Sequence, residues 1–320
     1  MSSFALRCAA VLSLFATNVF AVCAFAEEGT SPKPAEKAGD KLVPLNMSGT
    51  VLLDKDGKRV LVKSKVVLRE GVLEMLLCRK HTKEHESILA FEGNAYLIHA
   101  GLLAIGAKPG TPVSYLDGET KPPTGQRVDV FLQWKDEKGK LHREPAQKWI
   151  RHATHRYYVE KLQSPPAGFK LPKDSDLRYD AKHKELIWYG PMTEKQRDEF
   201  LGYSADEEYQ AAVKKMFQQG QSRPMKAHWI FAGSSYLVET DEQGKQVRHY
   251  QAEGGDVICV ANFPTALLDV SIESTATGEQ NLLFEAWTER IPPLETEVTL
   301  ELLPVFKKDE PAAPQKGPPR

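Results

Sequence analysis

The chain has 320 residues, of which 41% are hydrophobic and 27% are charged, so it can bury a core and is not disordered throughout. Its 42 lysines and arginines nearly balance its 43 aspartates and glutamates. This balance argues against a dedicated nucleic-acid binder, which carries a basic excess, and against an acidic solvating chain.

The N-terminus has the pattern of a secretory signal peptide over residues 1–26. One cation, Arg7, precedes an almost wholly apolar stretch that ends in the small-x-small sequence of residues 24–26. We expect cleavage near Ala26 and an exported chain, periplasmic or secreted, without a transmembrane span after cleavage. A retained transmembrane helix is one alternative. A lipid anchor at Cys23 is another.

Two polar segments flank the expected globular part, residues 42–304. Residues 27–41 are polar, contain two prolines and predict a flexible leader. Residues 305–320 predict a disordered, proline-rich tail, because 307–320 hold four prolines and no large apolar side chain. We therefore expect a single domain between two loose ends.

Short strands dominate the expected domain. Three segments that combine Asp with Gly, residues 54–58, 136–140 and 241–245, predict turns of β-hairpins. Residues 127–134 alternate, which places Val128 and Trp134 on the same face of a strand. Further strands are expected at 66–69, 72–78, 87–91, 228–232, 247–250, 256–260 and 296–303.

Helices are few. Asn94 can cap a helix that runs to about Ile105, and this helix is apolar on most sides, which predicts burial. Two more are expected over 192–201 and from an N-cap at Ser204 to about Gln219. The predicted fold class is α+β, with a mainly antiparallel β-sheet and one buried helix.

Two cysteines remain after signal cleavage, Cys78 and Cys259, each in an apolar strand-like run. In an oxidising compartment they can form one disulfide if their strands are neighbours. The alternative is two buried free thiols.

Residues 81–85 spell H-x-x-E-H, the zinc signature of inverted metallopeptidases. On a helix, His81 and His85 would share a face and could bind zinc, with Glu84 as general base. The segment lies between two strand-like runs, however, and an extended backbone separates the histidines by about 13 Å. A polar hairpin loop is therefore expected. A folded-back loop could still gather His81, His85 and Glu86 as metal ligands, which leaves a zinc-dependent hydrolase as the alternative function.

The candidate functional site is Lys83, His85, Glu86 and Ser87, together with His99 on the following helix. Burying these groups without partners would be costly, so a plain core role is excluded. Either they form a structural hydrogen-bonded network or they line a ligand cleft. We expect the network, and we expect no cofactor.

Several segments resemble the YdjY domain family: residues 83–87, 98–110, 228–234, 262–264 and 288–293. The resemblance implies an exported bacterial domain without an established activity. Some members resemble ferredoxins through an attached cysteine cluster, which this chain lacks. The family pattern passes almost directly from the segment near Trp149 to that near Trp229. Residues 151–226 are therefore interpreted as a partly helical insertion into one domain.

Taken together, the sequence predicts an exported binding or structural module of the cell envelope without established catalytic activity. Its partner would be an envelope protein or a small ligand.

Overall fold

The computed structural model describes residues 42–306, apart from 117–118, 166–168, 170, 173–174 and 272–283. The expected signal peptide, the expected leader and residues 307–320 of the expected tail lie outside these residues. Within the described part, none of the helices combines the length and the hydropathy needed to cross a membrane.

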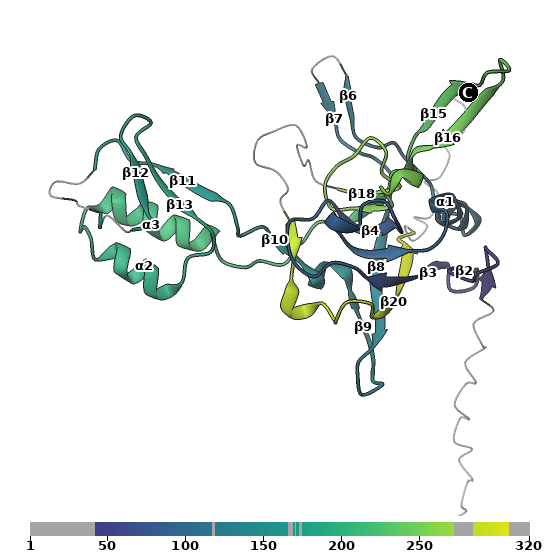
Figure 1. Cartoon of the computed structure of the whole chain (residues 1–320), viewed down its shortest axis with the longest axis horizontal. Coiled ribbons are helices and arrows are strands. Elements are labelled where there is room, and N and C mark those ends of the chain that lie inside the picture. Colours follow the sequence, from purple (N-terminus) through teal and green to yellow (C-terminus); the bar gives the residue numbers. More distant parts are fainter. Residues whose placement is uncertain are drawn as a thin grey trace, which may run out of the picture. The chain divides into compact units, whose positions relative to one another are not determined.

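Eight strands form a closed β-barrel (Figure 1). The barrel closes where β3 pairs with β5, through Lys65 opposite Ala90 and Val66 opposite Leu89. In order around the barrel the strands are β3 (Arg59–Val66), β20 (Glu297–Pro304), β8 (Gln126–Lys135), β14 (Trp229–Phe231), β18 (Leu268–Val270), β17 (Ile258–Cys259), β4 (Met75–Arg79) and β5 (Ser87–Phe91).

The predicted fold class is wrong. Among the described residues the structure is mostly β, with 38% strand and 18% helical residues, a closed eight-stranded barrel and three helices, instead of a mainly antiparallel sheet with one buried helix. Two of the barrel pairs, β4–β5 and β17–β18, are parallel. The alternation of apolar residues predicts that a strand has a buried face. It does not predict whether the two edge strands of the sheet pair with each other and close a barrel. Here the closure depends on two residue pairs between β3 and β5.

The three turns with Asp and Gly are confirmed as hairpins. The turns join β2 (Val51–Asp54) to β3, β8 to β9 (Leu141–Pro145), and β15 (Tyr236–Thr240) to β16 (Gln246–Tyr250). Each aspartate accepts backbone hydrogen bonds within its own turn: Asp54 Oδ1 from Gly57 N at 2.7 Å, and Asp136 Oδ1 from Lys138 N and Lys140 N, both at 2.9 Å. These local bonds fix the turn wherever the hairpin lies.

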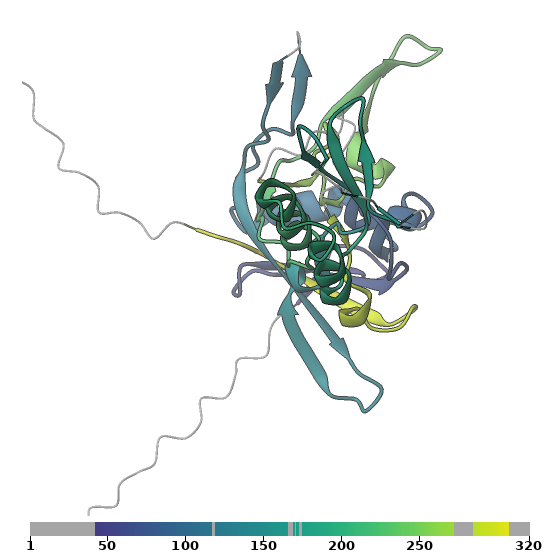
Figure 2. The same ribbon diagram turned by 90° about the vertical axis from the view of Figure 1, so that its left-hand side faces the viewer.

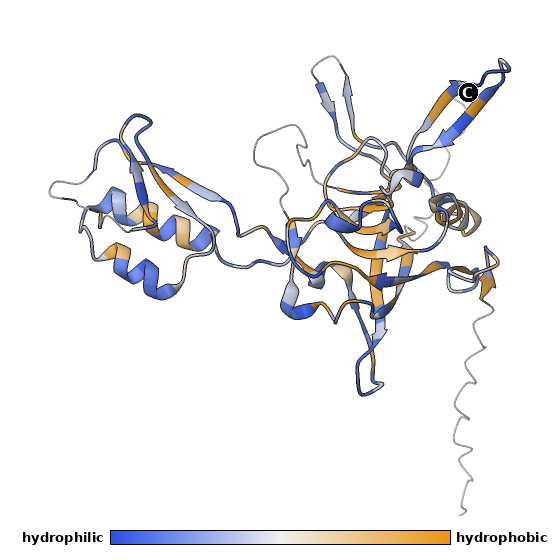
Figure 3. Ribbon diagram, viewed as in Figure 1, coloured by the Kyte–Doolittle hydropathy of each residue, from blue (hydrophilic) through white to orange (hydrophobic). Residues whose placement is uncertain are grey.

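The barrel interior holds the main hydrophobic core. The alternation expected along β8 is confirmed, with Val128, Val130 and Leu132 buried inside. In the colouring of Figure 3 the barrel strands carry the hydrophobic residues, whereas the hairpin turns are hydrophilic. Helix α1 (Ala95–Ala104) packs one face on the core through Ile98 and Leu102, while Tyr96 and Leu103 are exposed.

Residues from Tyr158 to Met216 build a second hydrophobic core of their own. A three-stranded sheet, ordered β11-β13-β12, packs with two helices, and Figure 2 views these helices nearly end-on. The N-cap of the second helix is Asp206, not the expected Ser204, because the Asp206 carboxylate accepts from Tyr209 N. The elements are β11 (Tyr157–Lys161), β12 (Arg178–Asp180), β13 (Glu185–Tyr189), α2 (Glu194–Leu201) and α3 (Glu207–Gln219).

The chain leaves the barrel and returns to it through neighbouring segments. His152 N donates to Arg223 O at 2.8 Å, and β14 then pairs with β8. The expected boundaries, 42–304 for the domain and 151–226 for the insertion, stay predictions. The remaining strands are β1 (Val43–Pro44), β6 (Ser114–Leu116), β7 (Glu119–Lys121), β10 (Ile150–His152) and β19 (Phe284–Ala286).

Candidate functional site

The expected site lies in the connection between β4 and β5. These strands pair in parallel, with Met75 opposite Ser87 and Arg79 opposite Phe91. Residues 80–86, which we call the crossover, therefore return the chain along the whole length of β4 before β5 begins. The polar hairpin loop expected here is wrong, because a hairpin joins antiparallel strands.

Lys83 lies in the crossover among three carboxylates. Its Nζ atom is 3.0 Å from Asp256 Oδ1, 3.4 Å from Glu74 Oε2 and 3.5 Å from Glu86 Oε1. Burial opposes the charge of Lys83, but the hydrogen bond and charge of Asp256 prevail and hold its pKa above the usual value. Burial and the adjacent Glu86 carboxylate raise the pKa of Glu74, against the opposing charge of Lys83. One shared cation thus balances several acids, which is what holds the crossover in place.

The segment that follows the short helix η3 (Gln251–Gly254) packs against the crossover and contributes Asp256 to this network. Gly255 has a φ of +120°, and a Cβ atom there would lie 2.6 Å from Thr82 Oγ1 and 3.1 Å from Lys83 Cγ. Only glycine permits both this backbone conformation and this close approach. The next residue, Asp256, also accepts a short hydrogen bond from Thr265 Oγ1. The crossover and residues 255–265 are therefore closely packed.

The structure brings together only part of the expected site. Lys83 and Glu86 meet in the network, and His85 Nε2 lies 3.7 Å from Glu86 Oε2, with its side chain 76% exposed. Ser87 is buried, and its hydroxyl donates to Leu89 O at 2.8 Å, so this hydrogen bond lies within β5 and does not belong to the Lys83 network. His81 is exposed in a left-handed turn with φ of +64°.

His99 belongs to a separate aromatic cluster. Its Nδ1 atom is 2.8 Å from the Tyr250 hydroxyl, which donates to Gly233 O at 3.1 Å. Since that hydroxyl has one proton, it accepts from His99 Nδ1–H. Burial lowers the pKa of His99 despite the nearby Gly233 carbonyl, so the ring is held neutral. This pair links α1 to the end of β16, and the bond from Tyr250 to Gly233 links both to the loop after β14.

No group of three His, Cys, Asp or Glu side chains arranged to hold a metal ion occurs in the described part of the chain. Cys78 and Cys259 are both buried and free, so of the two alternatives the structure shows the free thiols and no disulfide between them. Burial raises the pKa of both thiols, and Asp269 and Asp256 add to the effect at Cys259. Neither thiol is poised for nucleophilic chemistry.

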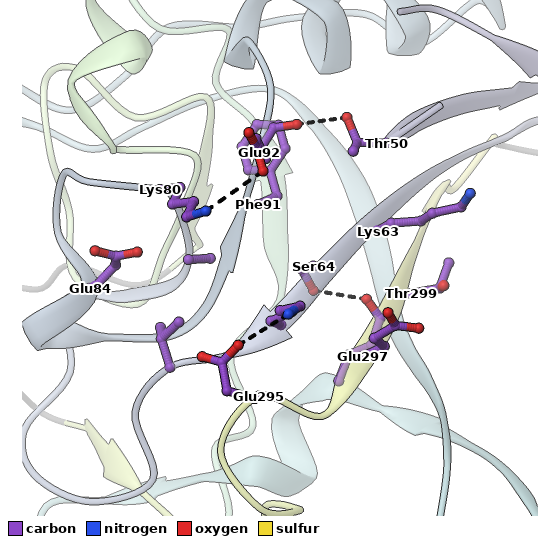
Figure 4. A pocket seen from close by; sticks show the side chains of 14 residues that line it. Thr50, Lys63, Ser64, Lys80, Glu84, Phe91, Glu92, Glu295, Glu297 and Thr299 are labelled. Atoms are coloured by element: carbon purple, nitrogen blue, oxygen red, sulfur yellow. Dashed lines mark hydrogen bonds and ion pairs between the residues drawn. The ribbon is translucent and has the colours of Figure 1, made fainter. Parts of the chain in front are cut away.

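A groove of about 560 Å³ opens where the barrel closes, between β3, β20 and the crossover (Figure 4). We call it the seam groove. Both charges line it: Lys65 pairs with Glu295 at 3.1 Å, and Lys80 with Glu92 at 3.7 Å. The remaining lining residues are Thr50, Lys63, Ser64, Val67, Glu84, Ala90, Phe91, Glu297, Val298 and Thr299.

Sequence reasoning missed this groove, apart from Glu84. Its walls come from segments more than 200 positions apart, which meet only because β20 inserts beside β3. The signal that was available is the alternation in β3, where Lys63 and Lys65 are exposed between buried neighbours. That alternation shows an outward face but not what lies opposite to it.

A buried acid was also missed. Asp269 is fully buried on β18, and its Oδ1 accepts from Asn262 Nδ2 at 2.9 Å and from Val270 N at 2.8 Å. Burial raises the pKa of Asp269 to about 7, against these hydrogen bonds. Asp269 lies between Leu268 and Val270 of the hydrophobic core, and the alternation of a strand would predict that a side chain at this position is exposed.

These features define a class: a closed eight-stranded β-barrel, with a second hydrophobic core between Tyr158 and Met216 and a surface groove beside the crossover that Lys83 holds. Residues 51–163 match the family model of the YdjY domain, which supports the suspected family and confirms the resemblance at residues 83–87 and 98–110. The resembling segments at 228–234, 262–264 and 288–293 lie outside the matched range. No curated protein and no solved structure gives a significant match.

Proposed function

We propose that this protein is a non-catalytic binding module that holds a short polar peptide segment in the seam groove. The observation that carries the proposal is the groove itself, which lies between a barrel wall and a crossover that Lys83 pins in place. A volume of about 560 Å³ falls in the range of small-ligand sites, roughly 300–1,000 Å³. A YdjY domain, a family without an established activity, is compatible with a module of this kind.

The chemistry of the lining favours a peptide. Lysines and glutamates of the groove can each pair with a charge of the opposite sign, and Thr50 and Thr299 add hydroxyls for backbone amides and carbonyls. Val67, which is partly exposed, supplies apolar contact for short side chains. A peptide with both charges matches this set better than a purely anionic or apolar ligand does.

The test is an NMR titration of ¹⁵N-labelled protein with short capped peptides that carry lysine, glutamate, both or neither. We expect shifts concentrated at the residues of the groove, largest for the peptide with both charges. Lys63→Glu should weaken binding about tenfold, because its side chain is exposed in the groove. The matched control is Lys182→Glu, an exposed lysine of the insertion, which should bind as wild type does. Shifts elsewhere, or none at millimolar peptide, would refute the proposal.

We also propose that the module works outside the cytoplasm, as its N-terminal sequence indicates. The mature chain should then begin at Glu27. N-terminal sequencing of the protein from its native host tests this, and recovery of Met1, or retention in a carbonate-washed membrane, would contradict it.

A further inference from the structure

A second groove, of about 680 Å³, lies at the end of the β8–β9 hairpin. We call it the Trp134 groove. It is formed by the hairpin on one side and by the segment before β20 on the other, and its lining residues are Trp134, Lys135, Asp136, Glu137, Lys138, His142, Pro292, Pro293 and Thr296.

The hairpin side of this groove is a rigid aromatic surface formed by Trp134 and His142, which we call the aromatic shelf. The rings of Trp134 and His142 stack, with centroids 5.0 Å apart and planes at 16°, and Trp149 packs edge-on against Trp134 from the core. Asp136 Oδ2 lies 2.8 Å from His142 Nε2 and fixes the imidazole. This hydrogen bond from His142 and those from the turn lower the pKa of Asp136, so it is ionised at neutral pH. The shelf is thus set before any ligand arrives.

Prolines form the other wall of the groove. Pro292 and Pro293 line it, and Leu294, next to Pro293, is 57% exposed. Aromatic-lined grooves are what proline-rich segments dock against, because their polyproline II helix is preformed and loses little entropy.

We propose that the Trp134 groove binds a proline-rich segment, and that its occupant is residues 307–320 of the same chain. This segment contains the P-x-x-P sequence from Pro311 to Pro314, followed by Pro318 and Pro319. The groove supplies the aromatic shelf for the proline rings, while Asp136 and Glu137 on its rim can pair with Lys316 or Arg320.

The tail is long enough to reach. The last described residue, Phe306, follows the end of β20, whereas the groove lies beside the start of that strand. Strand β20 has 8 residues and spans about 26 Å. Residues 307–320 in a polyproline II helix extend up to about 43 Å at roughly 3.1 Å per residue. The tail can therefore turn back along the outside of β20 and place its prolines on the shelf.

The experiment uses a fluorescein-labelled peptide of residues 307–320 and measures its fluorescence anisotropy with two full-length proteins. One is wild type, and the other has Pro311, Pro314, Pro318 and Pro319 changed to Ala. We expect the peptide to bind the second protein at least tenfold more tightly, because the native tail no longer competes. A peptide with the same proline-to-alanine changes should not bind.

His142→Ala, made in the protein with the altered tail, removes part of the shelf and should weaken peptide binding about tenfold. The matched control is His183→Ala, since His183 makes the same kind of ion pair, 2.8 Å from Asp180, but on the insertion. Absence of binding, or equal binding by both full-length proteins, would overturn the proposal. So would an oligomer that is lost when the tail is changed, because the tail would then occupy a second copy.

Discussion

The barrel has two polar connections of similar composition, the crossover at residues 80–86 and the hairpin turn at 136–140. They differ in whether local or distant contacts fix their conformation. The hairpin turn is fixed from within, by backbone hydrogen bonds to Asp136. The crossover is fixed from outside, by Asp256 and Gly255, each 173 positions further along the chain than the residue it contacts, Lys83 and Thr82. Locally encoded turns tolerate change around them, whereas the crossover depends on distant partners.

The largest contrast is expected from alanine at two glycines of positive φ. Gly255→Ala should lower the free energy of unfolding by about 3 kcal/mol. The left-handed backbone strain contributes about 1 kcal/mol, and steric overlap of the new Cβ atom with Thr82 contributes the rest. Gly139→Ala should lower the free energy of unfolding only by the backbone strain of about 1 kcal/mol, since nothing lies within 4 Å of its Cβ position. Urea unfolding measures both, and equal losses would contradict the close packing assigned to the crossover.

The second prediction concerns pH. The folded pKa of Asp269, about 7, lies above its ordinary value of 3.8, so its contribution to stability is fully present below that ordinary value and is lost as pH rises through 7. Asp269→Asn has no such titration. Relative to wild type, the variant should gain about 2 kcal/mol of unfolding free energy between pH 5 and pH 8. Parallel pH profiles in urea unfolding would show that Asp269 ionises normally.

Removing the cation of the crossover comes third. Lys83→Met should lower stability by about 1–2 kcal/mol at pH 7, a figure reduced for the 26% exposure of the side chain. The loss should shrink as pH falls below neutrality, because the raised pKa of Glu74 lets this partner of Lys83 become protonated and lose its charge. Lys138→Met, in the hairpin turn, is the control and should change the midpoint of unfolding little. A loss that does not depend on pH would argue for packing instead of charge.

The smallest effect is expected at the hairpin. The pKa of Asp136 is lowered, chiefly by the hydrogen bond from His142, so its contribution is present above pH 3.8 and is lost as pH falls, the reverse of Asp269. Asp136→Asn keeps the Oδ1 acceptor but loses the charge. A slight decrease in Tm at pH 7 that vanishes at pH 3 is the expected result, measured by circular dichroism.

The sequence predicted elements that depend on near neighbours and failed on those that do not. The turns at Asp54, Asp136 and Asp241 carry their own acceptors and glycines, so they could be placed as hairpins. Residues 80–86 contain no glycine, and their path depends on β17 occupying the other edge of β4. Barrel closure could not be predicted for the same reason.

The candidate site shows the same division between what the sequence could predict and what it could not. Lys83 and Glu86 could be singled out because charges between two apolar strands need partners, and the structure supplies those partners. The identity of the partners, Asp256 and Glu74, could not be read from spacing. His99 was grouped with Lys83 by proximity along the chain, yet it contacts Tyr250 instead. Residues close in sequence can face different neighbours once a strand and a helix turn separate them.

The position of β20 has a consequence for how the chain folds. This strand, residues 297–304, lies between β3 and β8, with Leu300 opposite both Val62 and Leu132. Two of the barrel's longest ladders therefore form only after residues 1–296 have been synthesised. Such a high contact order predicts slow folding. Until β20 arrives, the edges of β3 and β8 are open to pairing with other chains, so a chain cut off before residue 297 should aggregate instead of folding.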